Sequence, residues 1–494
     1  MARTPADIGG LDRGVQSVRM TSVPGERHSA PAVVESKPHP GVIRTFDDAQ
    51  RYLYSRVNFE RSRPRNIDPS AFKLDRTIAL LAALGDPHTN FRSVHVAGSK
   101  GKGSVCEMVA SALGACGYAV GVYTSPHLVD ITERVRVGNQ PIARAAFVSM
   151  VERCRIAAET LPARMGECTF FELMTALAFE YFAHQAVDVA VVEVGLGGRL
   201  DCTNVITPEV CGLTSIQLEH TDILGATLAE IAGEKAGIMK AGVPAVTVPQ
   251  ELEVMEVFRR KAEEVGAPLF VLGEDVEYSC RFEAGHDLGP HARICVDSPR
   301  SLYEHIAVPF RGEHQAANCG LALALLDQLA ARGFVAPEGE VARGLANTPT
   351  HGRMELAWSK PRILLDTAHT PESVRALIKA AGAHLRFDSL VAIFGCSSDK
   401  NADAMLAEIA RGADKVIFTR VSGNPRAMSP EELACRFEET GAMCQVAPTL
   451  KEAINIAARA VQRDDLILIT GSCYLVGEAK RLLAEHAARK QGGA

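Results

Sequence analysis

The sequence lacks the cysteine pattern of a zinc protein. It contains 13 cysteines, an odd number, but no two have Cys-x-x-Cys spacing, and no Cys/His run has the spacing of a zinc site. Most of them lie in apolar stretches, as Cys211 and Cys295 do. We therefore expect reduced thiols that pack as small apolar side chains, which indicates a reducing cytoplasm.

The sequence also lacks long apolar runs and an excess of positive charge. No stretch is apolar over the length that a membrane-spanning helix needs. Lys and Arg total 53 against 59 Asp and Glu, a formal net charge of −6, which is unlike a protein built to coat nucleic acid. Residues 1–43 contain no apolar core of a secretory signal and are rich in Pro, Ser, Gly and charge, so we expect a disordered leader. We expect a monomer with neither a membrane nor a nucleic acid as partner.

The composition leaves room for two folded domains. The chain has 494 residues, of which 47% are hydrophobic. From residue 44 onward, short apolar runs alternate with segments of helical pattern, the first of which is capped by Thr45. We expect further helices at 103–116 and 170–185, and strands at 92–97, 118–124, 187–194, 210–216 and 243–248. This alternation predicts an α/β fold in which helices cover both faces of a parallel sheet.

The pattern changes twice in the second half of the chain. Residues 275–310 contain short strand-like runs joined by turns, which predict an antiparallel patch. After residue 350 the alternation restarts, with apolar runs in PRILLD, SLVAIFG, DKVIFTR and DLILITG. We therefore expect a first α/β domain at 44–350 and a smaller one at 351–494. Their junction, NTPTHGRMEL (347–356), is rich in turn residues and holds an arginine, and active sites favour such clefts between domains.

The segment HVAGSKGKGSV (95–105) lies between an expected strand and an expected helix. Its glycines Gly98, Gly101 and Gly103 let backbone N–H groups approach a phosphate, and the helix N-terminus adds to the attraction. Lys102 would neutralise the β- and γ-phosphates of a nucleotide, and Ser104 would offer its hydroxyl to Mg²⁺. Gly103 separates the lysine from the serine, which departs from the usual spacing. The alternative is a glycine-rich surface turn, and the flanking strand and helix favour the phosphate loop.

Three residues later in the chain are candidates for a site shared with this loop. Two of them come at or after the ends of expected strands, and the third lies on an expected helix. Glu193 ends the apolar run VDVAVVEV, at the carboxyl end of a parallel strand, where a carboxylate is well placed for Mg²⁺. His220 comes just past the next strand and is either structural or a metal ligand. Lys235 lies on the following helix, where a solvated surface lysine is the ordinary alternative.

Taken together, the motifs resemble the folylpolyglutamate synthase/dihydrofolate synthase family, within the wider Mur ligase superfamily. The matching segments follow the family order from about residue 50 to residue 480: HVAGSKGKGS, GVYTSPHL, TFFEL, VVEVGLGGRLDCTN, LEHTDILG, EKAGI, RGEHQAAN, HGRMEL, LLDTAHTPES, GCSSDK and GSCYLVGEA. The run GLGGRLDCTN with EHTDILG and EKAGI is highly specific. The resemblance implies an N-terminal P-loop-type ATPase domain with a mostly parallel sheet and a smaller, Rossmann-like C-terminal α/β domain.

The resemblance also implies roles for individual residues. The metal-binding positions of the family match Ser104, Ser125, Glu193, His220 and Lys235. Its nucleotide-binding positions match Gly98, Gly101, Lys102, Gly103 and Ser104 in the loop and Asn318, Arg353, Asp366 and His369 at and beyond the domain junction. Positions near the pterin match Thr169, Phe171 and Asp201. The implied catalytic residues are Lys102, His220 and Lys235.

Lys235 matches a lysine that CO₂ carboxylates in these enzymes. The carbamate turns a cation into an anion that can bind a second Mg²⁺. The reaction needs a neutral amine, which burial and nearby cations favour.

The implied reaction joins L-glutamate to a carboxylate of dihydropteroate, of a folate that already bears glutamate, or of both, with ATP as co-substrate and an acyl phosphate as intermediate.

Two departures from the family pattern stand out. Lys100 replaces the asparagine of the usual G-T-N-G-K-G-S loop, and D-T-A-H-T-P replaces D-G-A-H-N-P while keeping Asp366 and His369.

Three other functions remain open from the sequence. A nucleotide-dependent switch would be expected to carry a guanine-reading N-K-x-D, and none is present. An inactive nucleotide-binding scaffold has only Lys100 as a hint. A cell-wall Mur ligase is the nearest alternative, and TFFEL with GLGGRLD favours the folate branch.

Overall fold

The structure is a computed structural model that describes residues 41–60, 74–285, 289–298, 300–308, 312–438 and 443–492. The expected leader lies outside the described residues up to position 40. Of its last three residues, Ile43 is buried, and its backbone N–H donates to Glu152 Oε2 at 3.1 Å. Ile43 is therefore part of the folded first unit, although the expected leader included it.

The first sheet has eight strands in the order β4-β3-β2-β5-β1-β6-β7-β8. Six of them are parallel: β1 (Arg92–Ala97), β2 (Val120–Tyr123), β5 (Val189–Glu193), β6 (Val210–Leu213), β7 (Ala245–Thr247) and β8 (Leu269–Val271). The short edge strands β3 (Val135–Val137) and β4 (Gln140–Pro141) run antiparallel. The predicted, mostly parallel sheet is confirmed, although the expected strand at 210–216 ends three residues earlier.

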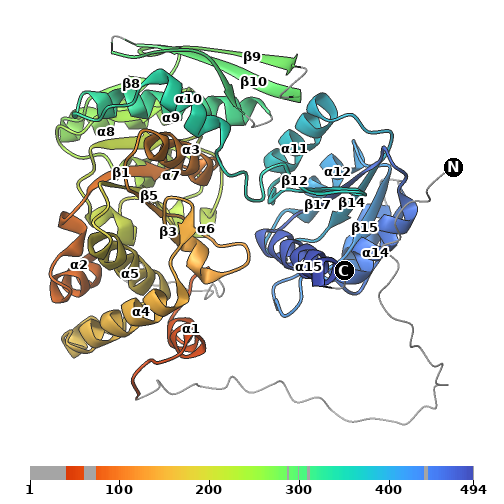
Figure 1. The fold of residues 1–494 in the computed structure, drawn as a ribbon, viewed down its shortest axis with the longest axis horizontal. Coiled ribbons are helices and arrows are strands. Elements are labelled where there is room, and N and C mark those ends of the chain that lie inside the picture. Colours follow the sequence, from red (N-terminus) through yellow and green to blue (C-terminus); the bar gives the residue numbers. More distant parts are fainter. Residues whose placement is uncertain are drawn as a thin grey trace.

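Helices cover both faces of this sheet (Figure 1). One face packs against α3 (Lys102–Ala115), α9 (Glu313–Ala330) and α10 (Glu338–Ala346). The other packs against α1 (Phe46–Tyr54), α2 (Leu74–Ala83), α4 (Arg144–Glu159) and α5 (Phe170–His184) at one end, and against α7 (Leu228–Ala236) and α8 (Leu252–Val265) at the other. The helix expected at Thr45 is confirmed, because Thr45 and Asp48 form a reciprocal capping box.

The antiparallel patch expected at 275–310 is a separate sheet of β9 (Glu277–Gly285), β10 (Gly289–Asp297) and β11 (Leu302–Val308). It extends beyond the first sheet at the top of Figure 1, in green. Its apolar side chains Ile294, Val296 and Ile306 belong to the same core as α9. The patch is thus part of the first unit.

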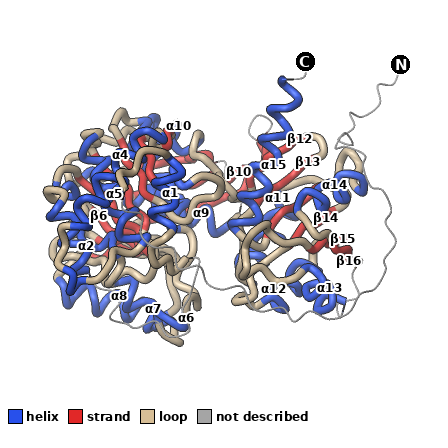
Figure 2. The backbone as a smooth tube through the Cα atoms, turned by 90° about the horizontal axis from the view of Figure 1, so that it is seen from below, coloured by secondary structure: helices blue, strands red, loops and turns tan. Residues whose placement is uncertain are grey.

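The second unit is built on six strands in the order β12-β13-β17-β14-β15-β16. They are β12 (Glu355–Ser359), which is antiparallel, and the parallel strands β13 (Arg362–Leu365), β14 (Leu390–Phe394), β15 (Lys415–Phe418), β16 (Cys444–Val446) and β17 (Leu466–Thr470). One face packs against α11 (Pro371–His384), α12 (Ala402–Ala410) and α13 (Pro430–Glu438), and the other against α14 (Leu450–Ala460) and α15 (Cys473–Gly492). Figure 2 shows this α/β arrangement beside the first unit.

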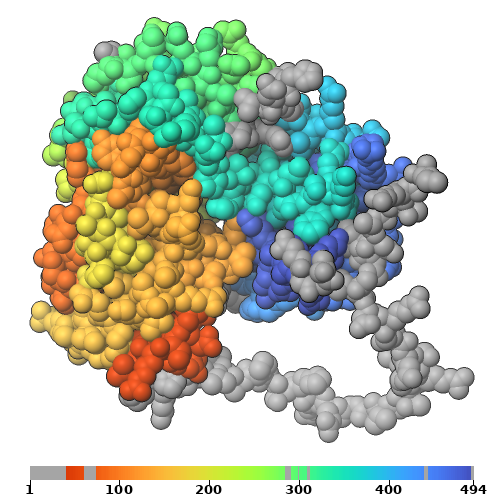
Figure 3. Space-filling view, in the orientation of Figure 1, coloured from red at the N-terminus to blue at the C-terminus, as the bar shows by residue number. Residues whose placement is uncertain are grey.

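The two units meet at the side of α9 and α11. Lys379 Nζ lies 3.0 Å from Glu313 Oε1, and the rings of Phe282 and His384 are in tilted contact with their centroids 4.8 Å apart. Figure 3 shows two masses in contact. The expected boundary at 350/351 falls between α10 and β12 and stays a prediction.

Among the described helices, none combines the length and the apolar character that crossing a membrane requires.

Candidate active site

The site lies at the carboxyl ends of four neighbouring parallel strands. The glycine-rich loop follows β1, Ser125 follows β2, Glu193 ends β5, and Glu219 follows β6. In a parallel sheet these ends share one edge, where ligands of open α/β sheets bind. Residues that are more than 120 positions apart therefore converge.

The glycine-rich loop is shaped by two close approaches. Gly98 has φ +146°, and a Cβ there would overlap the Thr214 hydroxyl. Gly101 has φ +94° and is the N-cap of α3, and a Cβ there would overlap the Asn318 side chain. Both positions thus require glycine, since a larger residue would be strained and would have no room. The same contact brings Asn318 of α9 against the loop.

Lys102 begins α3 and folds back over the loop. Its Nζ donates to the Gly98 carbonyl oxygen at 3.0 Å. The first turn of a helix offers backbone N–H groups that no residue of the helix can accept, and the helix dipole favours an anion there. The loop, the helix start and the lysine therefore bring together the donors that a phosphate group needs, and their role as its binding site stays a prediction.

Glu193 faces the first turn of α3. Its Oε2 accepts from the Ser125 backbone N–H at 2.9 Å, and a Cβ at Gly103 would lie 3.7 Å from that oxygen. Burial raises the pKa of Glu193, while the ammonium group of Lys102 opposes the shift. A buried carboxylate against Gly103, the residue before the hydroxyl-bearing Ser104, fits a divalent cation that prefers oxygen ligands. Within the described ranges, no three His, Cys, Asp or Glu side chains form a metal cluster, and the expected ligand set contains only two residues of those types.

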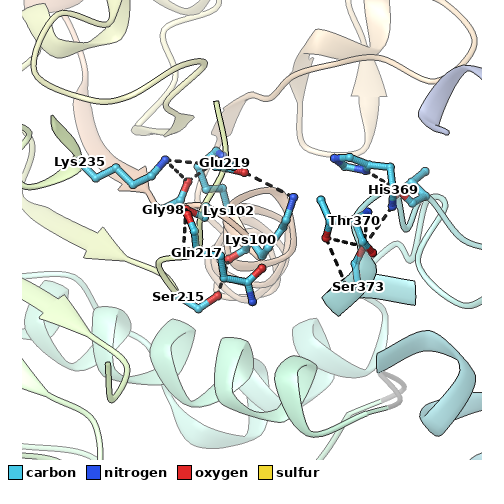
Figure 4. Close-up of polar contacts among 12 residues, drawn as sticks. Gly98, Lys100, Lys102, Ser215, Gln217, Glu219, Lys235, His369, Thr370 and Ser373 are labelled. Carbon is cyan, nitrogen blue, oxygen red and sulfur yellow. Dashed lines mark hydrogen bonds and ion pairs between the residues drawn. The ribbon is translucent and has the colours of Figure 1, made fainter. Parts of the chain in front are cut away.

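Lys235 is buried and paired, which excludes the surface reading of this residue. Its side chain is 2% exposed, and its Nζ lies 2.9 Å from the Gly98 carbonyl oxygen and 3.1 Å from Glu219 Oε1 (Figure 4). Burial lowers its pKa to about 8, although Glu219 acts in the opposite direction. Lys235 is therefore closer to neutrality at physiological pH than an ordinary lysine.

Glu219 bridges two lysines. Its second oxygen lies 3.4 Å from Nζ of Lys100, the residue that replaces the family's asparagine. Burial alone would raise the pKa of Glu219, but Lys235, Lys102 and Lys100 bring it down to about 2. His220, the N-cap of α6 (Thr221–Leu224), has φ +49° and adds to this lowering. Glu219 is thus an anion that neutralises part of a strongly cationic loop.

The second unit contributes groups from the end of β13. Asp366 accepts from the backbone N–H groups of Met354 and Ala368 at 2.9 and 2.8 Å, and Arg353 donates to the Thr367 hydroxyl. Burial raises the pKa of Asp366, and Arg353 opposes it. Arg353 also opposes the raised pKa of Glu193, so its charge acts on both units.

His369 faces the phosphate loop across the contact between the units (Figure 4). Its Nδ1–H donates to the Thr367 carbonyl oxygen at 2.8 Å. Burial lowers its pKa to about 3, and the ammonium group of Lys100 contributes. His369 is therefore a neutral imidazole within the field of the loop.

Two of the residues expected near a pterin, Phe171 and Asp201, lie against Gly195, which is two residues after Glu193. The Phe171 ring lies against Gly195, where a Cβ would overlap it. The Gly195 N–H also bonds to the Asp201 carboxylate, so an aromatic face and a carboxylate meet at one glycine. Thr169 is the N-cap of α5, and its hydroxyl accepts from the Glu172 N–H at 3.3 Å. This cap fixes the first turn of the helix, which contains Phe171.

Both units match family models. Residues 96–326 match the Mur ligase middle domain, and residues 352–473 match the Mur ligase, glutamate ligase domain. A dihydrofolate synthase/folylpolyglutamate synthase of Bacillus subtilis is 32% identical over 445 residues, which cover 90% of this chain and 100% of that protein. The chain belongs to the folylpolyglutamate synthase/dihydrofolate synthase family.

Solved structures agree with this membership of the folate branch. The folylpolyglutamate synthase of Mycobacterium tuberculosis complexed with ADP is 32% identical, with a TM-score of 0.80 over 89% of this chain and 98% of that one. E. coli FolC in complex with DHPP and ADP is 29% identical, with a TM-score of 0.78 over 91% and 100% of the two chains. A probable bifunctional folylpolyglutamate synthase/dihydropteroate synthase of Halobacterium salinarum is 36% identical, and this chain spans 49% of its length.

Sequence reasoning missed one residue of this folate-branch site, Glu219. It precedes His220 and follows β6, so the argument that singled out Glu193 at the end of β5 also applies to it. The signal was therefore present. The pairing of Glu219 with Lys100 and Lys235, both of which the sequence analysis names, could not be found in this way, because neither lysine is close to it in the sequence.

Proposed function

We propose that this chain joins L-glutamate to the carboxylate of dihydropteroate, of a folate, or of both. The protein is an ATP-dependent ligase of the folate branch, and ATP is its co-substrate. Dihydrofolate or a folylpolyglutamate would be the product, with ADP and phosphate. The observation that carries the proposal is the short connection at the end of β5: Glu193 faces the phosphate loop, and Gly195, two residues later, joins Phe171 to Asp201.

The reaction follows from these positions. The loop with Lys102 would hold ATP so that its γ-phosphate meets the carboxylate of the pterin substrate. Phosphoryl transfer gives an acyl phosphate and ADP. The amine of glutamate attacks the activated carbonyl, and the tetrahedral intermediate loses phosphate to leave an amide. Lys102 would stabilise negative charge on the group in transfer, since a preorganised cation acts most strongly where charge develops.

The proposal includes a first Mg²⁺ held by Glu193, Ser104 and Ser125. The ion would supply charge neutralisation to the phosphates. A second Mg²⁺ would use His220 and a carboxylated Lys235. The ammonium form of Lys235 would repel a cation, so this second site depends on the carbamate.

The remaining roles are assigned by position. Asn318, Arg353, Asp366 and His369 would contact the nucleotide from α9 and from the second unit. Thr169 would complete the pterin site. A cytoplasmic location, a monomeric state and the domain limits 44–350 and 351–494 stay predictions from the sequence.

One assay tests this function. Purified protein is given ATP, L-glutamate and either dihydropteroate or tetrahydrofolate, and the products are separated by mass. We expect ADP release that requires both the pterin compound and glutamate, together with a product one glutamyl unit heavier. ADP release that is independent of both substrates would instead favour a nucleotide switch or scaffold.

A further inference from the structure

A line of three buried side chains runs from the middle of β1 to the expected pterin carboxylate. His95 Nε2 lies 2.8 Å from the Thr203 hydroxyl, and that hydroxyl lies 2.5 Å from Asp201 Oδ1. His95 and Thr203 have no exposed surface, and Asp201 is 5% exposed. None of the reaction steps described above uses His95 or Thr203.

The direction of each hydrogen bond in this line can be deduced. Asp201 already accepts from the backbone N–H groups of Leu196 and Thr203, at 2.8 and 3.0 Å. Burial raises the pKa of Asp201, and these hydrogen bonds to the carboxylate oppose the rise. The geometry of the backbone donors places the carboxylate as an acceptor. The Thr203 hydroxyl must therefore donate its single proton to Asp201. Its oxygen is then left to accept, so His95 donates from Nε2–H.

The other nitrogen of His95 agrees with this assignment. Nδ1 is buried and has no hydrogen-bond partner. If the proton were on Nδ1, a buried N–H would be left unpaired and the Thr203 proton would be drawn to two acceptors. A neutral Nε2–H tautomer avoids both problems, and burial lowers the pKa of His95 to about 3, which keeps the ring neutral.

We propose that His95 and Thr203 are positioning residues that hold the Asp201 carboxylate, as a fixed acceptor, toward the N–H donors of the pterin ring. This inference rests on the proposed function, because it takes Asp201 as a pterin contact. The backbone bonds and the Thr203 bond fix the plane of the carboxylate. His95 occupies the acceptor side of the hydroxyl and so prevents the Thr203 proton from turning away from Asp201.

The consequence is selective for one substrate. In the proposed function the phosphate loop would contact ATP through backbone groups and Lys102, with which none of the three side chains shares a hydrogen bond. Loss of the Thr203 hydroxyl frees the Asp201 carboxylate to turn and weakens its own bond to the pterin, and a hydrogen bond to a charged group is worth about a factor of ten or more in binding. The KM for the pterin substrate should therefore rise while the KM values for ATP and glutamate stay the same.

The test compares Thr203→Val, Thr203→Ser and Asp201→Asn in initial-rate assays with dihydropteroate, ATP and glutamate varied separately. We expect Thr203→Val to raise the KM for dihydropteroate about ten-fold, and Thr203→Ser, which keeps the hydroxyl, to stay near wild type. Thr419→Val is the matched control, because Thr419 is a buried threonine of the second unit whose hydroxyl has no partner. An equal rise in all three KM values would show a merely structural role and overturn the proposal.

Two further comparisons keep the outcomes distinct. If Asp201→Asn leaves the KM for dihydropteroate unchanged, the pterin site itself is wrongly placed and the proposed function needs revision. If Asp201→Asn raises it and Thr203→Val does not, only the positioning line fails. Should Thr203→Val not fold, His95→Gln and His95→Leu decide: the amide can donate to Thr203 and should act like wild type, whereas the apolar side chain should raise the pterin KM alone. Equal behaviour of these two variants contradicts the proposal.

Discussion

Nζ of Lys235 lies 3.1 Å from Oε1 of Glu219, at a place closed to solvent. The other oxygen of Glu219 lies 3.4 Å from Nζ of Lys100. Glu219 would therefore keep a cationic partner if Lys235 became a carbamate. Without Lys100, a Glu219 carboxylate beside a carbamate would have lost both of its paired lysines, which is unfavourable in a buried site.

The first prediction concerns this pair. Lys235→Arg keeps the positive charge, but a guanidinium group cannot form the carbamate, so we expect loss of most activity in both Lys235→Arg and Lys235→Ala. Removal of CO₂ from the wild-type protein should lower its activity, and bicarbonate should restore it. Lys261→Arg is the control and should behave as wild type, because Lys261 lies on α8 and pairs with Glu264 of the same helix. Near-normal kcat in Lys235→Arg would refute the carbamate.

The second prediction concerns the phosphate loop. Lys102→Ala removes the cation that folds over Gly98, and we expect turnover to fall about 10²–10³-fold or more, as for other groups that stabilise developing charge. Turnover of the wild type should depend on both ATP and Mg²⁺. The Tm of the variant should stay close to wild type, with Lys261→Ala as the control. Turnover near wild type in Lys102→Ala would show that the loop does not hold the reacting phosphates.

The third prediction uses the glycine that joins the aromatic ring to the carboxylate. A methyl group at Gly195 would overlap the Phe171 ring and displace it. We expect Gly195→Ala, Phe171→Ala and Asp201→Ala each to raise the KM for the pterin substrate much more than the KM for ATP. Gly339→Ala is the matched control, since a Cβ at Gly339 meets nothing within 4 Å. An effect confined to ATP would contradict the placement of the pterin.

The fourth prediction concerns pH and stability. Folding lowers the pKa of His95 from 6.5 to about 3. Between these values the unfolded chain binds a proton that the folded chain does not, so stability falls as the pH falls below 6.5, by about 1.4 kcal/mol per pH unit. Unfolding by urea at several pH values should show this slope, which His95→Gln should reduce. His184→Gln, at an exposed position, should leave it unchanged. An unaltered slope in His95→Gln would mean that the imidazole takes up a proton in the folded state.

The fifth prediction concerns the two units. Arg353 and Asp366 lie in the second unit, while Lys102 and Glu193 lie in the first, so a nucleotide that contacts both should draw them together. We expect solution scattering to report a smaller radius of gyration when nucleotide and pterin are bound. Identical profiles with and without these ligands would contradict the prediction.

Much of this fold can be predicted from local patterns. The run VDVAVVEV has no polar face, and the strand it forms, β5, is buried along its whole length. A strand of this kind requires cover on both sides, and the helical segments between the strands indicate that a parallel sheet between helix layers supplies it. The ends of the strands were less certain: β6 stops at Leu213, although the apolar pattern continues to residue 216.

The sequence by itself determined the phosphate loop, because glycines with a lysine between a strand and a helix have few other uses. Only the tertiary structure decided the state of Lys235. Its helix gives no sign that this lysine is buried, and its two acceptors come from Gly98, 137 residues away, and from Glu219. An ammonium group can leave water only where other parts of the chain bring oxygen atoms to it, and that convergence exists only in the folded protein.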